Sequence, residues 1–287
     1  MSRAPLATDS ARTRTAVIGG SPASTLAVAL LLTQLLVACG SPRATTGERN
    51  RKTEEQFKLR CSSAGEQIRR TVKDVEGIFL LKLRPSDLNY SDQFRMDDPY
   101  GRDFGGERYI KSFLKATREL DRAYAALRKN SAPPERDELF GYSYVEAVDS
   151  ADGRRYRYTA YLAQPGKTDP RYLLEYFKVV LQRSPAPGAM PRYGVTYDDI
   201  STREDRLAWI AGSSLKVIDL QTQEVVGERI GYMMDRGQGA SGGGRSPWLS
   251  AASTACPAFP GQHAEQVGQT IRFVEKVLGP ARSPDGF

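Results

Sequence analysis

The segment Leu215-Lys-Val-Ile-Asp-Leu-Gln-Thr-Gln-Glu-Val-Val226 sets the class of the fold, because two apolar runs flank a short polar turn. Alternating apolar and polar residues have the period of two that places successive side chains on opposite faces of a strand. The second run continues to Met234, so the segment predicts a β-hairpin that turns at 221–223. A preceding strand is predicted over 207–211, ended by Gly212-Ser-Ser.

The same alternation continues towards the middle of the chain. Phe140–Val148 and Tyr156–Leu162 predict two strands, and Asp149-Ser-Ala-Asp-Gly153 between them is typical of a hairpin turn. Further strands are predicted over Tyr172–Leu181 and Tyr193–Ile200. Strands that follow one another through short turns pair antiparallel, so we expect a meander of roughly six to eight strands.

Helical spacing is found nearer the two ends of the chain. Residues 53–62 predict a short helix and residues 109–128 a longer one, whereas 72–84 predict a buried strand that ends at Pro85. Glu265–Leu278 predicts an amphipathic helix followed by Gly-Pro. The expected class is therefore α+β: a mostly antiparallel sheet, meander or sandwich-like, with N- and C-terminal helices packed on it.

Composition excludes some classes of partner. The 287 residues are 40% apolar and 26% charged, which is typical of a globular protein. The formal net charge of +7 comes from 41 basic and 34 acidic residues, and the basic residues do not gather into a stripe. We therefore expect interspersed surface charges and no nucleic-acid partner.

The N-terminal residues 1–38 have the pattern of a signal peptide. Three arginines precede the uncharged apolar run 25–38, which is shorter than the ~20 residues that span a bilayer. The run ends in Leu36-Val37-Ala38-Cys39, which resembles the lipobox of bacterial lipoproteins. The resemblance implies a diacylglyceryl thioether on Cys39, cleavage before it, and a fatty acid such as palmitate on the new amino terminus.

The resemblance also implies a location. Residues 39–52 are polar and predict a flexible tether, which leaves 53–287 as a single β-rich globular domain. Gly40 and Ser41 lack the aspartate that retains many lipoproteins at the inner membrane, so we expect an outer-membrane anchor that faces the periplasm. The stretch from Tyr193 to Cys256 is similar to uncharacterised proteobacterial envelope lipoproteins, a resemblance that implies no activity.

Two cysteines remain besides Cys39. Export would place Cys61 and Cys256 in an oxidising compartment, where paired cysteines usually form disulfides. The alternative is two separate buried thiols. Two cysteines and a single histidine, His263, are too few and too scattered for a metal site, and no cofactor motif is present.

Two segments carry candidate binding residues. Asp198 and Asp199, close to Arg203, offer paired carboxylates for a cation or for acid–base chemistry, whereas the alternative is a set of turn and cap residues. The glycine-rich loop that ends at Trp248 offers Arg245 for an anion and the indole as an aromatic anchor. The alternative is a long loop that packs Trp248 back onto the sheet.

These features favour binding over catalysis. His263 lacks recognisable catalytic neighbours, and no Gly-x-Ser-x-Gly motif is present. We therefore expect a non-catalytic lipoprotein that binds another envelope protein, as an adaptor or as an inhibitor of a secreted toxin. The competing hypothesis is an enzyme or sensor that acts on cell-wall glycans through the acids near 198–205.

Overall fold

A computed structural model describes residues 46–86, 93–94, 96–101, 104–127, 140–259, 266 and 268–281. The chain divides into two compact units, Met1–Asn50 and Arg51–Phe287, and every described strand belongs to the second. The fold class is α+β with a mostly antiparallel sheet, as the sequence predicted.

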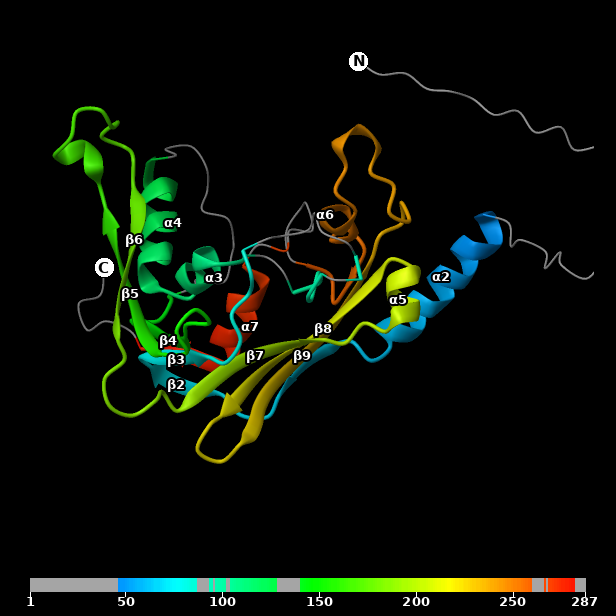
Figure 1. Cartoon of the computed structure of the whole chain (residues 1–287), viewed down its shortest axis with the longest axis horizontal. Helices are drawn as coiled ribbons and strands as arrows, with labels where there is room; N and C mark the ends of the chain where they lie inside the picture. The colour runs from blue at the N-terminus through cyan, green and yellow to red at the C-terminus, as the bar shows by residue number, and fades with distance from the viewer. Residues whose placement is uncertain are drawn as a thin grey trace, which may run out of the picture. The chain divides into compact units, whose positions relative to one another are not determined.

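One large sheet dominates the second unit (Figure 1). Its strand order is β1-β9-β8-β7-β3-β4-β5-β6, and the short β10 pairs with β9. The strands are β1 (Gly65–Ile68), β3 (Gly77–Leu80), β4 (Tyr144–Val148), β5 (Arg155–Ala163), β6 (Lys178–Pro185), β7 (Tyr193–Asp199), β8 (Ile210–Asp219), β9 (Glu224–Met234) and β10 (Ala255–Cys256).

The local hairpins are confirmed, but the simple meander is wrong. Strands β8 and β9 pair antiparallel around the predicted turn, and β4 and β5 pair around Asp149–Gly153. However, β3 lies between β7 and β4 and is parallel to both. The sheet therefore consists of two antiparallel groups, β7-β8-β9 and β4-β5-β6, joined through an earlier strand that no local pattern places there.

The buried strand predicted over 72–84 is two strands in two different sheets. Strand β2 (Val72–Val75) pairs in parallel with β11 (Leu278–Pro280), whereas β3 enters the large sheet. Asp74 has a φ of 58°, a left-handed conformation that regular strands do not contain. This residue lies inside β2, where the pairing with β11 shifts register, and Glu76 then separates β2 from β3.

Two other strand boundaries differ from prediction. Residues Arg203–Leu207 form helix α5, held by a capping box between Thr202 and Asp205, so the strand begins only at Ile210. That strand then continues through Gly212, where a Cβ would lie 2.4 Å from a ring carbon of Tyr232. Position 212 therefore requires glycine because of close packing, and it is not a turn. The strand predicted from Tyr172 begins only at Lys178.

The helices also have different bounds. The predicted 109–128 helix is two, α3 (Glu107–Ser112) and α4 (Lys115–Leu127), because the Phe113 carbonyl accepts a hydrogen bond from the Tyr142 N–H at 2.8 Å. Helix α2 runs over Thr46–Cys61, so the second half of the segment 39–52, which was expected to be a tether, is helical. Its first turns are polar and lack the apolar period by which helices are recognised. The remaining helical elements are η1 (Pro165–Lys167), η2 (Gly242–Gly244), α6 (Pro247–Ala251) and α7 (Gln269–Val277).

The main core lies between the sheet and α7, the red helix of Figure 1. Phe273 and Val277 of α7 are fully buried and meet side chains such as Val195 and Val217 from the central strands. Burying each such side chain stabilises the fold by about 1.5–3 kcal/mol. The helix that the sequence predicted at 265–278 thus covers the sheet, as expected.

A disulfide joins α2 to β10. Cys61, the last residue of α2, is bonded to Cys256 of β10 across a sequence separation of 195. The predicted pairing is confirmed. Phe57 of α2 packs beside it in a second cluster with Ile210 and Met234, so α2 is held to the sheet both covalently and by apolar contact.

The turn after β8 supports a prediction about pH. Asp219 is fully buried and accepts hydrogen bonds from Arg192 and Arg70 at 2.7 and 2.8 Å. The hydrogen bonds from Arg192, against the cost of burial, lower the pKa of Asp219 to about 2. The unfolded chain therefore binds this proton first as the pH falls, so stability is lost between about pH 4 and pH 2.

Urea unfolding of the wild type and of Asp219→Asn at a series of pH values checks this. We expect the wild type to lose more stability than the variant over that interval, because only the wild type has the depressed carboxyl group. Equal slopes for the two proteins would contradict the assignment.

Candidate functional site

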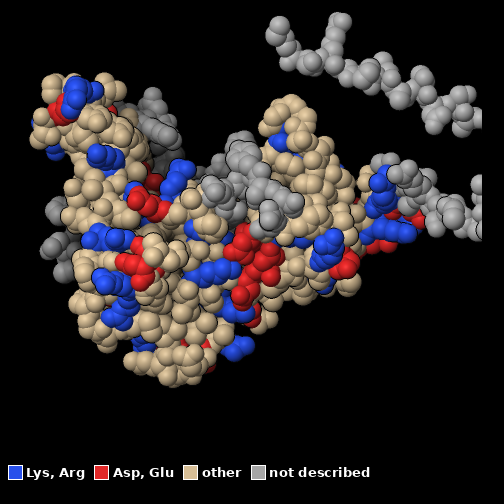
Figure 2. Space-filling view, in the orientation of Figure 1, with Lys and Arg blue, Asp and Glu red and all other residues tan. Residues whose placement is uncertain are grey.

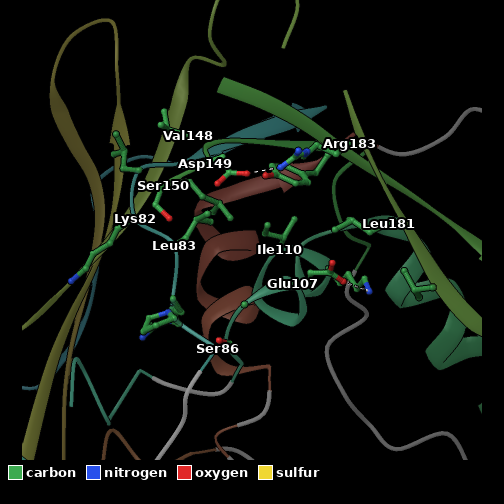
Figure 3. A pocket seen from close by; sticks show the side chains of 18 of the residues that line it. Lys82, Leu83, Ser86, Glu107, Ile110, Val148, Asp149, Ser150, Leu181 and Arg183 are labelled. Carbon is green, nitrogen blue, oxygen red and sulfur yellow. Dashed lines mark hydrogen bonds and ion pairs between the residues drawn. The ribbon is translucent and has the colours of Figure 1, made fainter. Parts of the chain in front are cut away.

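A groove lies where the parallel strands β3 and β4 end. The carboxyl ends of parallel strands meet at one edge of a sheet, and the chain beyond each strand lines the space there. The groove has a volume of about 1120 Å³, and its walls are the segment after β3, the turn after β4, the inner side of β6 and helix α3 (Figure 3).

The interior of the groove combines apolar and polar side chains. Leu83, Ile110 and Leu181 come from three separate elements and lie around it in Figure 3. Val148 and Leu81 also line it and are 46% and 43% exposed, so they offer apolar surface to a ligand. Apolar walls with a few placed polar groups are typical of binding pockets.

Two ion pairs flank this apolar surface. Asp149 and Arg183 lie 2.5 Å apart on one side, and Glu107 and Lys111 lie 3.0 Å apart on α3 (Figure 3). Each of these two carboxylates is thus paired with a cation, so the two pairs add no net charge to the groove. Figure 2 shows acidic and basic side chains interspersed over much of this face of the protein, as composition predicted.

A buried ion pair lies behind the groove. The guanidinium of Arg84, which lines the groove, is 2.8 Å from the carboxylate of Asp98, and both side chains are almost completely buried. The Arg84 guanidinium also stacks 3.8 Å from the ring centre of Tyr197. Burial raises the pKa of Asp98, and the contact with Arg84 opposes that rise. The contact with the cation therefore offsets only part of the cost of burying the carboxylate, whose pKa stays above its usual value.

The loop that carries Asp97 and Asp98 is tied to the sheet by further contacts. The Asp98 N–H donates to Asp199 at 3.1 Å, and Asp97 forms an ion pair with Lys82 at 3.0 Å. Asp199 also pairs with Arg206, whose guanidinium donates to the Met96 carbonyl. These charges fix the loop against the carboxyl ends of β3 and β7, which supports the back wall of the groove.

The predicted carboxylate pair does not form a site. Asp198 and Asp199 are consecutive in a strand, so their side chains leave on opposite faces. Asp198 is half exposed and pairs with Lys216 at 2.9 Å, whereas Asp199 turns inward to Arg206. Arg203 stacks 5.2 Å from the ring of Phe94. The alternative of turn and cap residues fits these contacts better.

The glycine-rich loop likewise turns inward. Trp248 is 2% exposed and packs 5.2 Å from the ring of Trp209, so its expected role as a surface anchor is wrong. Arg245 forms an ion pair with the buried Asp235 and donates to the Ala240 carbonyl at 2.7 Å. The loop packs back onto the sheet, and the anion that Arg245 binds is Asp235 of the same fold.

The remaining sequence candidates lie outside the described residues: Cys39 and His263 fall in segments whose placement is not described. Over the ranges that are described, no three His, Cys, Asp or Glu side chains gather in a way that could hold a metal ion. No helix in the same ranges is long and apolar enough to cross a membrane.

Sequence reasoning missed the groove for a physical reason. Leu83, Ile110, Val148 and Leu181 lie far apart in the sequence, and each resembles an ordinary core residue of its own element. The one available signal was Pro85, which marks the end of a buried run next to a polar loop. Recognising the groove required the order of the strands, which local patterns do not contain.

Comparison with known proteins adds no further assignment. No protein-family model, no curated protein and no solved structure matches this chain.

Proposed function

We propose that the chain is a membrane-anchored, periplasm-facing lipoprotein that binds another envelope protein without catalysis, and that the groove is its binding site. The observation that carries this proposal is the groove itself: a volume of about 1120 Å³ whose walls include exposed apolar side chains between two ion pairs. Apolar surface of this kind is stabilised when a partner covers it.

The anchor rests on the sequence of the N-terminal segment. The lipobox 36–39 follows an uncharged run too short to span a bilayer, so a lipid on Cys39 would provide the attachment. The disulfide between Cys61 and Cys256 is consistent with an oxidising compartment such as the periplasm. The expected location is the outer membrane.

Binding is preferred to catalysis because three of the four acidic residues over 198–205 are already paired. Asp198, Asp199 and Asp205 each contact a Lys or Arg side chain within the fold. A glycosidase-type mechanism needs two carboxylates that face one substrate. No contact among the described residues favours that alternative, so the glycan enzyme is the weaker candidate.

Crosslinking in the native envelope tests the proposal. The full chain with a C-terminal tag is compared with Val148→Asp, which places a charge on exposed apolar surface of the groove, and with Leu249→Asp. Leu249 is 52% exposed on α6 and does not line the groove. We expect the wild type and Leu249→Asp to crosslink to the same partner protein. The amount of that partner recovered with Val148→Asp should be lower by about tenfold or more.

The same samples report on the anchor, because mass spectrometry of the N-terminal peptide shows whether it begins at an acylated Cys39. A partner that remains with Val148→Asp would show that the groove is not the binding site. An unmodified peptide that extends upstream of Cys39 would contradict the lipid anchor.

A further inference from the structure

Strand β6 ends the large sheet on one side. It is the last strand in the order and pairs only with β5. The pairing runs through eight residue pairs, from Tyr156 with Pro185 to Ala163 with Lys178, without a change of register. An edge of this length without a bulge is the form that most readily accepts another strand.

The direction of the peptide groups along this edge follows from one hydrogen bond. The Ala186 N–H donates to the Arg155 carbonyl of β5 at 3.1 Å. Peptide groups along an antiparallel strand point alternately towards its neighbour and away from it. The N–H and C=O groups of Val179, Leu181 and Arg183 therefore point away from β5, and no other described segment bonds to them.

The two faces beside this edge differ in chemistry. Side chains of Leu181 and Arg183 lie on the side that lines the groove (Figure 3). The opposite face carries Lys178, Val180 and Gln182 of β6 together with Arg157 of β5, since residues that pair directly share a face, and Lys178 also borders the groove. A strand added to β6 would thus lie beside Leu181 and Arg183 on the groove face and beside Lys178 on the other, with the β5 arginines one strand further in.

Charge disfavours a second copy of the chain as that strand. Strands β5 and β6 contain four basic residues and no acidic one. Glu146 of β4 lies between Arg155 and Arg157, and Asp149 pairs with Arg183. The edge keeps a net positive charge, so two copies joined at β6 would repel. An acidic strand is the complementary occupant.

We propose that β6 binds an extended, acidic segment of the partner protein by strand addition. Its apolar side chains face the groove and its acidic side chains face Lys178, in alternation. Main-chain hydrogen bonds to the outward groups of Val179, Leu181 and Arg183 supply affinity, and the groove supplies selectivity. This inference rests on the proposed function and names the chemistry of the partner at that site.

A single backbone N–H provides the test. Val179→Pro removes an outward-pointing donor, and proline is tolerated on an edge strand where its missing N–H would face solvent. Val179→Ala is the matched control, because it shortens the same side chain and keeps the N–H. Both variants are made in the full chain, and circular dichroism and urea unfolding verify that each one folds.

The probe is a pool of synthetic ten-residue peptides with Glu at every second position and Val or Thr between. A second pool carries Lys in place of Glu, and a third is N-methylated at alternate residues and cannot complete a ladder. We expect wild type and Val179→Ala to bind the first pool about tenfold or more tightly than either of the others. Val179→Pro should bind the first pool no more tightly than the wild type binds the N-methylated pool.

Three results would overturn the proposal: no binding of the acidic pool by wild type, equal binding of the Lys pool, or undiminished binding by Val179→Pro. A dimer of the wild type that Val179→Pro converts to a monomer would assign the edge to a second copy instead. Crosslinking in the envelope separates the two proposals. A native partner lost with Val148→Asp but kept with Val179→Pro would leave the groove as the binding site and exclude strand addition.

Discussion

Replacing Cys61 and Cys256 together by alanine is expected to lower the free energy of unfolding by roughly 3–5 kcal/mol. The disulfide closes a loop with a sequence separation of 195, and a long closed loop strongly restricts the unfolded chain. The bond also holds α2, whose Phe57 packs on Ile210 and Met234 at one end of the sheet. Without it, α2 depends on that small apolar cluster and a few ion pairs.

Urea unfolding of the full chain, with and without a thiol reductant, measures this effect. Reductant should destabilise the wild type by a similar amount and leave the double variant unchanged. If the double variant unfolds within about 1 kcal/mol of the wild type, the disulfide does not contribute to stability in this way.

Arg84→Met is expected to destabilise the fold by about 3–5 kcal/mol, because it leaves the carboxylate of Asp98 buried without its cation. Both side chains are almost wholly inaccessible, and their atoms lie 2.8 Å apart. The loop that carries Asp98 supports the back wall of the groove through Asp199. We therefore expect binding of the envelope partner to weaken together with stability.

The double variant Arg84→Met/Asp98→Asn separates charge from packing. Asparagine keeps an oxygen for the Gly101 N–H and tolerates the positive φ of 48° at this position. It should recover part of the lost stability, since neither charge then remains buried. A double variant less stable than Arg84→Met would mean that the cost of the single substitution lies in lost packing and not in the unpaired charge.

Features of the fold that depend on neighbours in the sequence were predictable. The β8–β9 hairpin, the β4–β5 turn and helix α7 each follow from a period and a turn signal within one segment. The position of β3 in the sheet was not predictable, because a short apolar strand carries no information about which distant strands flank it. The length of helix α2 was underestimated because its first turns have no apolar face.

The candidate site shows the same division. Conspicuous residues such as Asp199, Arg245 and Trp248 proved to be partners of buried charges and rings. Residues that look ordinary, such as Val148 and Leu181, line the groove because of how the strands are ordered. The disulfide was the exception, since only two cysteines remained to be paired once Cys39 was set aside.

The position of the disulfide also determines how the fold would respond to mechanical load. A force applied between the two ends of the chain enters at α2, crosses from Cys61 to Cys256, and leaves through the residues beyond β10. Residues 62–255, including β6 and the groove, lie inside the loop that the disulfide closes, whereas α7 and β11 lie beyond it and carry the load. An oxidised molecule pulled at its ends would lose α7 and β11 and then stop extending at the disulfide, whereas a reduced one would continue to unravel through the large sheet.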